Sequence, residues 1–219
     1  LVISSIGFTS GTNVLTVGSM TVHENLTLPA NTTLLQNSTN TLAINNTFTM
    51  KDGSKLAHTM NSTDKSSAIN LSVSGDMTVE AGGNINVDGM GYAGGTAGQS
   101  GYGPGYGGGS IENGGGGAGY GGNGGIGHGG TAGGATYGLI STPGELGSGG
   151  GGSNGVCGGS GGGLITVKVG GTLTVNGEIS AKGYAGQSNS NYGGGGGSGG
   201  GIYVTASDLQ GTGSITANG

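Results

Sequence analysis

Six asparagines in the first third of the chain carry its clearest chemical signature. Each lies two positions before a serine or threonine, with no proline between, which is the acceptor pattern for N-linked glycans. They are Asn25, Asn31, Asn37, Asn45, Asn61 and Asn70. An Asn- and Thr-rich stretch also produces such triplets by chance, but their concentration between residues 25 and 72 predicts that several carry glycans. Glycosylation would place the chain outside the cell or on its surface.

Acidic residues that could serve in catalysis are scattered. Asp76, Glu80 and Asp88 form the only close group of carboxylates, and a solvated strand face accounts for them. The chain has no arginine, so the base of pectate-lyase-type sites on β-helices is missing. General acid–base chemistry needs positioned partners, and no short motif supplies them. We therefore predict that the chain is not an enzyme.

Metal and cofactor motifs are equally sparse. The histidines, His23, His58 and His128, are far apart and show no metal-binding spacing. The stretch GGNGGIGHGG lacks the aspartate of calcium-binding glycine repeats, and no GK[ST] motif follows any glycine loop. The sequence predicts no metal and no cofactor.

Cys157 is the single cysteine, so an internal disulfide is impossible. Two interpretations remain for it: an unpaired small residue inside a glycine run, or a thiol that links two chains.

Composition points to a structural role. The 219 residues include 61 glycines but only three prolines, and the glycines lack the strict three-residue period of collagen. Charged residues make up 7%, with a net charge of −5 and no basic cluster, so we expect no nucleic-acid partner. No apolar run approaches the roughly 20 residues that span a bilayer, so we expect no membrane insertion. Because the chain begins LVISSIG and ends TANG within a repeated phrase, we expect a processed chain or a portion of a longer one.

Strands are predicted where apolar and polar residues alternate. Such alternation occurs at 14–22, 25–28, 41–44, 47–50, 69–73, 76–79 and 84–87. No window shows apolar residues at helical spacing for three turns, so helix should be almost absent.

Later strands repeat one phrase, an apolar strand, a glycine turn and a second strand. It occurs at 76–95, 171–188 and 207–219. Units too small to bury a core alone, repeated in this way, favour a stacked solenoid. We therefore predict an all-β parallel β-helix, ahead of a β-sandwich. The near-hexad spacing of Asn25, Asn31 and Asn37 suggests a left-handed hexapeptide helix, but it fades within three copies.

The runs GYAGGTAGQSGYGPGYGGG (91–109) and GGSGGGLITVKVGGTLTVNGEISAKG (158–183) resemble the glycine-rich parallel β-helix modules of large secreted or cell-surface proteins. The similarity covers roughly residues 83 to 219 and concerns architecture. It implies β-helical coils interrupted by long Gly/Tyr excursions. The tracts are also similar, more weakly, to the polyglycine-II tracts of a bacteriophage tail-fibre adhesin.

The resulting organisation is one continuous solenoid domain. It comprises Asn/Thr-rich coils (1–88), a Gly/Tyr-rich excursion (89–163) and further coils (164–219) with a second excursion (183–201). The glycine tracts are either disordered or packed as extended polyglycine-II-like strands that bond laterally. Tyrosines spaced through the tracts favour order.

Two functions are compatible with these features. The first is a structural extracellular glycoprotein, a building block of a filament, surface appendage or wall layer, assembled as a homopolymer by end-to-end stacking. The alternative is an adhesin that binds carbohydrate or another cell through its Gly/Tyr excursions. A carbohydrate-active enzyme ranks third.

Overall fold

The computed structural model describes residues 2–3 and 13–219. Residues 1 and 4–12 of the predicted first region lie outside the described residues. Regular structure is almost entirely β-strand, and the one helical element within the described ranges is a 3-10 turn, η1 (His128–Gly130). The prediction of an all-β chain with almost no helix is confirmed for this part of the chain.

Within residues 2–3 and 13–219, seventeen strands form three parallel sheets. The first sheet contains β1 (Val2–Ile3), β3 (Met20–Val22), β6 (Leu42–Ile44), β9 (Ile69–Val73), β12 (Leu164–Val169) and β15 (Gly201–Thr205), in that order. The second contains β4 (Leu26–Leu28), β7 (Phe48–Met50), β10 (Met77–Val79), β13 (Thr172–Val175) and β16 (Asp208–Gln210). The third contains β2 (Asn13–Val17), β5 (Thr32–Gln36), β8 (Lys55–His58), β11 (Asn84–Asn86), β14 (Glu178–Ser180) and β17 (Ser214–Thr216).

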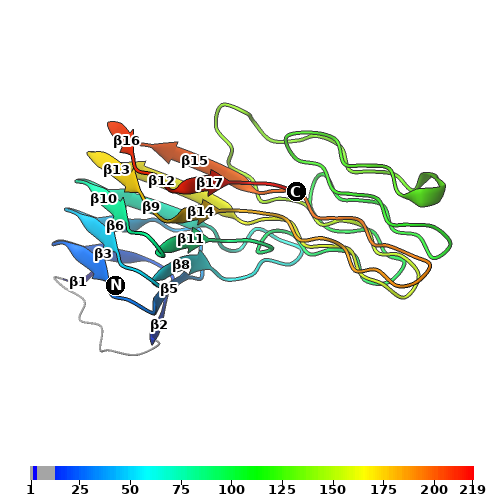
Figure 1. Cartoon of the computed structure of the whole chain (residues 1–219), viewed down its shortest axis with the longest axis horizontal. Coiled ribbons are helices and arrows are strands. Elements are labelled where there is room, and N and C mark those ends of the chain that lie inside the picture. Colours follow the sequence, from blue (N-terminus) through cyan, green and yellow to red (C-terminus); the bar gives the residue numbers. More distant parts are fainter. Residues whose placement is uncertain (1, 4–12) are drawn as a thin grey trace.

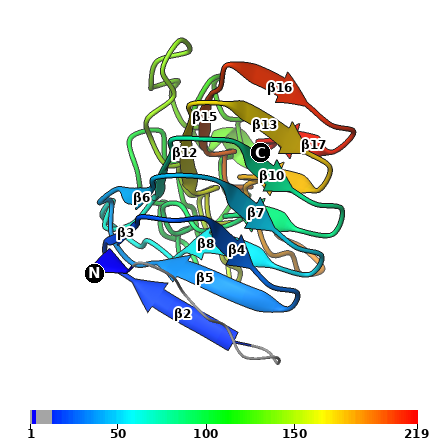
Figure 2. The same cartoon turned by 90° about the vertical axis from the view of Figure 1, so that its left-hand side faces the viewer.

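Consecutive strands visit the three sheets in turn. From β3 onward, each strand pairs in parallel with the strand three places later in the chain. Short strands therefore rise as a stack, with β1 and β2 at one end and β15, β16 and β17 at the other (Figures 1 and 2).

The core consists of apolar columns that run through the stack. In a strand alternate side chains face the same side, so aligned strands place their inward residues above one another. One column joins Leu26, Phe48, Met77 and Leu173 by direct register, and all four are at most 1% exposed. A second column in the third sheet is Leu34, Leu56, Ile85 and Ile179.

The predicted strands at 25–28, 41–44, 47–50, 69–73, 76–79 and 84–87 are confirmed, whereas the run at 14–22 is divided into β2 and β3, which belong to different sheets. Strands β5 and β8 were not predicted, because each places a polar residue at an inward position. Gln36 and His58, which end these strands, are both 0% exposed. Their polarity breaks the apolar alternation that marks the other strands.

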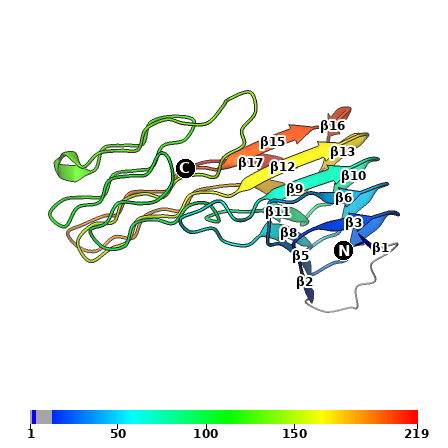
Figure 3. The same cartoon turned by 180° about the vertical axis from the view of Figure 1, so that it is seen from behind.

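Two glycine-rich connections leave the stack where the third sheet passes the chain to the first. Residues 87–163 join β11 to β12, and residues 181–200 join β14 to β15. Figures 1 and 3 show them as long extended runs that lie side by side beyond the strands. We call residues 89–163 and 183–200 the glycine bundle.

The glycine bundle is ordered by backbone hydrogen bonds rather than by sheets. Its central tract, residues 146–153, is buried along its whole length. The backbone of this tract bonds to six neighbouring segments. They are 92–95, 99–102, 107–110, Gly116, 159–162 and 195–198.

The bond directions in the central tract repeat every three residues. The N–H groups of Gly147 and Gly150 both donate to segment 159–162, and their carbonyl oxygens both accept from segment 92–95. Gly149 and Gly152 both donate to segment 99–102 and accept from segment 107–110. Three residues per turn is the periodicity of the polyproline-II conformation.

Close approach of the segments leaves no room for a side chain at the glycines of the central tract. A Cβ atom on Gly151 would lie 1.8 Å from the carbonyl oxygen of Gly108, and one on Gly149 would lie 1.9 Å from that of Ala93. These neighbours are backbone atoms, so relief would require a whole segment to move.

Replacement of Gly151 by alanine should therefore lower the free energy of unfolding by about 3 kcal/mol, the cost of overpacking against rigid backbone. Gly125→Ala is the matched control, because a Cβ there has nothing within 4 Å and its backbone is not left-handed. It should change stability by no more than about 0.5 kcal/mol. Denaturant unfolding followed by far-UV circular dichroism measures both, and equal effects would contradict this packing.

Candidate functional site

The carboxylates that lie closest in sequence do not converge in space on one site. An Asp76 carboxylate oxygen accepts the backbone N–H of Thr172 in the next coil at 2.7 Å. Glu80 forms an ion pair with Lys51 in the previous coil. Both carboxylates therefore link neighbouring coils at their corners.

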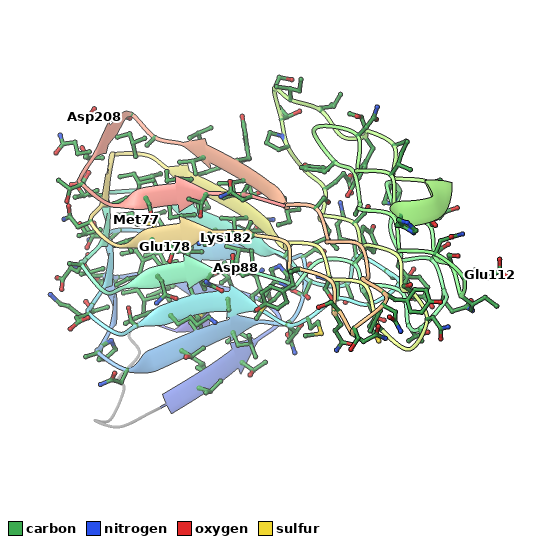
Figure 4. The ribbon with its side chains drawn as sticks, turned by 45° about the vertical axis from the view of Figure 1, so that its right-hand side comes forward. Met77, Asp88, Glu112, Glu178, Lys182 and Asp208 are labelled. Atoms are coloured by element: carbon green, nitrogen blue, oxygen red, sulfur yellow. The ribbon has the colours of Figure 1, made fainter. Side chains whose placement is uncertain are left out.

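Asp88 has a similar structural role at the end of β11. Its Oδ1 accepts the Lys182 backbone N–H at 2.7 Å and the Ser180 hydroxyl at 2.5 Å. The Lys182 ammonium lies 2.8 Å from Glu178, and this carboxylate raises the pKa of the lysine. Figure 4 shows these three charged residues on one outer face of the third sheet.

The remaining carboxylates are widely separated. Glu112 lies at the far end of the glycine bundle, whereas Asp208 lies at the opposite end of the molecule (Figure 4). Within the described ranges, no three His, Cys, Asp or Glu side chains gather closely enough to hold a metal ion.

His58 is the one histidine that is fully buried in the described chain. Its Nδ1 lies 2.7 Å from the carbonyl oxygen of Thr59, to which it donates. Its Nε2 accepts the backbone N–H of Leu164 at 3.3 Å, where the chain returns from the glycine bundle to the first sheet. The ring therefore joins the end of β8 to the start of β12 as a neutral imidazole.

This environment controls the protonation of His58. Burial lowers the pKa of the ring from 6.5 to about 4, opposed in part by the Thr59 hydrogen bond. Protonation would also turn Nε2 into a donor that faces the Leu164 donor. His58 is thus a structural residue and not a titrating group at neutral pH.

The six candidate glycan acceptors have different environments. Asn25, Asn31, Asn37 and Asn45 are exposed, and Asn70 is half-buried. Asn25 uses only its oxygen, which accepts from Thr47, whereas the Asn45 and Asn70 amide nitrogens lie within hydrogen-bond distance of neighbouring groups. Asn31 has a left-handed backbone at the turn before β5, with φ of 58°.

Asn61 differs from the other five acceptors because it is 2% exposed. Its amide nitrogen donates to the carbonyl oxygens of Ser67 and Met90, at 3.0 and 2.9 Å. Its side-chain oxygen accepts the backbone N–H groups of Ser66 and Ser67. Asn61 therefore ties the loop between β8 and β9 to the root of the glycine bundle.

Cys157 is half-buried with a free thiol. Its backbone N–H and carbonyl both bond to Gln187, one through the glutamine side chain and one through its backbone N–H. This contact couples the first glycine connection to the second.

The tyrosines of the bundle divide into two groups. Tyr137 and Tyr120 pack edge to face with ring centroids 4.8 Å apart, and the Tyr137 hydroxyl donates to the Leu146 carbonyl and accepts from Ser148. Burial raises the pKa of Tyr137. These two rings hold the start of the central tract, as the sequence predicted for the tyrosines as a class. Tyr102, Tyr106 and Tyr184 are instead largely exposed.

Strands β15, β16 and β17 lie at the same end of the three sheets, and β16 and β17 present core-facing apolar residues to solvent. Leu209 and Ile215 are 57% and 42% exposed, whereas Leu173 and Ile179, which pair with them in the preceding coil, are 0% exposed. The outer edges of all three strands are also free of a neighbouring strand within the described chain. The sequence predicted stacking at the ends of the solenoid, but it did not identify Leu209 and Ile215 as exposed residues there.

Hairpin tips form a second exposed surface at the far end of the bundle. A depression of about 270 Å³ there is lined by Asn154, Gly155 and residues 189–192. The Asn189 side chain donates to the Asn154 carbonyl at 3.1 Å and accepts the backbone N–H of Tyr192 at 2.9 Å. The tips are thus polar and mutually bonded.

No family model, curated protein or solved structure matches this chain. Among the described residues, no helix has the length and apolar character needed to cross a membrane. The functional argument therefore depends on the surfaces described above.

The buried His58 predicts a specific dependence of stability on pH. Because its folded pKa of about 4 lies below the unfolded value of 6.5, its contribution is complete above pH 6.5 and is lost as the pH falls toward 4. The loss should reach about 3 kcal/mol. His58→Gln should have a smaller decline in unfolding free energy over this range, measured by denaturant titration at each pH. Parallel pH profiles for the two proteins would contradict this assignment.

Proposed function

We propose that this chain is a structural, non-enzymatic extracellular glycoprotein, a building block of a filament, surface appendage or wall layer. In this proposal the three parallel sheets are the faces of one β-helix, and subunits stack end to end into a homopolymer. The pairing of each strand with the strand three places later supports such a coil.

The exposed face of the β15–β17 coil carries the proposal. Burial of a leucine or isoleucine side chain contributes about 1.5–3 kcal/mol, so a second copy that covers Leu209 and Ile215 would gain several kcal/mol. It would also pair the open strand edges, which otherwise form a template for association.

The opposite end of the stack offers a complementary surface. Strands β1, β2 and β4 form the other edges of the three sheets, and Leu15 on β2, which pairs with the inward-facing Leu34, is only partly buried. Contact between two different ends is heterologous, so it can continue without closing and generate a fibre. Asp208 is the only charged residue between 201 and 219, so charge repulsion across the contact is small.

The glycine bundle would project sideways from such a fibre as a polyglycine-II-like lattice. The three-residue repeat of bond directions in the central tract supports this interpretation. A lattice of this kind is rigid without a side-chain core, which suits a load-bearing surface structure.

An adhesin remains the second candidate, and the polar depression at the hairpin tips favours it. Amide and hydroxyl groups can hydrogen-bond to sugars, and a tyrosine ring can stack on them. These groups are supplied there by Asn154, Asn189, Ser190, Asn191 and Tyr192. Electron microscopy separates the two functions, since an adhesin predicts isolated rods and a structural subunit predicts regular fibres.

Glycosylation should follow the exposure of the acceptors. Expression through a eukaryotic secretory pathway should yield folded protein with a glycan on Asn25 and none on Asn61, whose amide nitrogen is buried and bonded. Thr27→Ala, which removes the Asn25 acceptor pattern, should lower the mass by one glycan. Thr63→Ala removes the Asn61 pattern, and it should not lower the intact mass by a glycan. A glycan loss in Thr63→Ala would contradict this assignment.

Stacking should depend on Leu209. Leu209→Lys places a charge on the exposed apolar face, and it should abolish fibres in negative-stain electron microscopy while the circular dichroism spectrum is unchanged. Thr174→Lys, a half-buried outward position in the preceding coil, is the control and should retain fibres. A wild-type chain that stays monomeric up to its solubility limit, or a Leu209→Lys variant that forms the same fibres, would overturn the proposal.

A further inference from the structure

A groove of about 660 Å³ lies along the glycine bundle. One wall is formed by residues 117–118 and 120–125, and the other by residues 196–200. Ile202, Ala217 and Gly219 close the end near the strands. We call this feature the glycine groove.

The wall at 196–200 belongs to a tract whose hydrogen-bond pattern is incomplete. In tract 193–200, the N–H groups of Gly194 and Gly197 donate to the segment at 184–187, and those of Gly195 and Ser198 donate to the central tract. Gly196 and Gly199 occupy the third position of the repeat, and their N–H groups make no bond to any described residue. The unpaired donors of this tract therefore recur every three residues.

Carbonyl groups show the same periodic gap. The oxygens of Gly195 and Ser198 accept from Gly159 and Gly162, whereas those of Gly194 and Gly197 accept no bond from the described chain. The central tract bonds to six segments, but tract 193–200 bonds to four, at 115–118, 148–151, 159–162 and 181–187. Two neighbouring positions are therefore vacant, and a further extended segment with the same three-residue repeat would fill one of them.

The opposite wall carries unpaired backbone groups as well. Residues 121–123 and 125 are exposed, and a Cβ atom added at Gly121, Gly122 or Gly125 would meet nothing within 4 Å. The N–H groups of Gly121 and Gly125 also make no bond within the described ranges. This outer segment begins with a bend at residues 121–122 and has one free side.

We propose that the glycine groove binds the outer glycine segment, 121–125, of a second copy of this chain. Because that segment is also one wall of the groove, two copies related by a twofold axis would each insert it into the groove of the other, an isologous contact. No charged residue lines the groove, so no repulsion opposes the contact. Four of the five residues of the inserted segment are glycines, so its backbone can approach the groove closely enough to form backbone hydrogen bonds.

This contact is lateral and differs from the proposed end-to-end contact at Leu209. In an assembled filament it would join neighbouring filaments side by side through their bundles. The lateral contact rests on the proposed function only for its place in an assembly, because two subunits that are not stacked could also form this contact.

The test uses the full chain with Leu209→Lys, which removes stacking, in sedimentation velocity over a range of concentrations. Dimers should form as the concentration rises. In this background Gly196→Val fills the groove, and its Cβ has only the Tyr184 carbonyl oxygen nearby, at 3.8 Å, so the fold should persist. It should weaken dimerisation by at least about tenfold.

Gly193→Val is the matched control, because it lies in the same tract with nothing within 4 Å of its Cβ but does not line the groove. It should change the dimerisation constant by less than about twofold. Circular dichroism verifies that both variants are folded. A chain that remains monomeric, or dimers that Gly196→Val does not weaken, would overturn the lateral contact, while fibre formation by the wild type would separately support stacking.

Discussion

Hydrogen bonding between backbones at contact distance is the interaction on which the glycine bundle depends. A buried peptide group must be paired, and in sheets the pairing occurs with two neighbours in one plane. In the central tract, donors and acceptors instead point in several directions around the axis, so each segment bonds to neighbours on all sides. Only glycine permits this, because a Cβ at Gly150 or Gly152 would lie about 2 Å from a neighbouring carbonyl oxygen.

The molecule thus combines two kinds of interior. Columns such as Leu26–Phe48–Met77–Leu173 exclude water from the strands by apolar packing, whereas the bundle is held by polar groups. Both interiors share the strand-to-strand spacing of the sheets. The two connections leave from the paired strands β11 and β14 and re-enter at the paired strands β12 and β15. His58 and Asn61 lie where the two interiors meet, and their hydrogen bonds satisfy backbone groups that neither packing scheme pairs.

Local alternation was sufficient to predict most strands, because the apolar inward residues of segments such as 69–73 and 76–79 are contiguous in sequence. It missed β5 and β8, since Gln36 and His58 are buried for reasons set by distant residues, Asn70 and Leu164 among them. Composition left the glycine tracts open between disorder and order, because their partners are non-local: Gly151 bonds to Gly116 and Gly195, and no periodicity in sequence identifies those pairs. The same limit applies to the candidate surfaces, which depend on the arrangement of the coils in space.

The three-residue repeat of bond directions also governs how such a bundle can change in length. An insertion of one residue in a tract would rotate every later N–H and C=O by about a third of a turn and direct each toward the wrong neighbour. An insertion of three residues in each arm of a hairpin would restore the direction and move the hairpin tip outward by about 9 Å. Because both ends of each connection are fixed at the strands, the sheets would not be affected. The bundle can therefore lengthen in triplets, and the reach of the molecule can vary while its base stays the same.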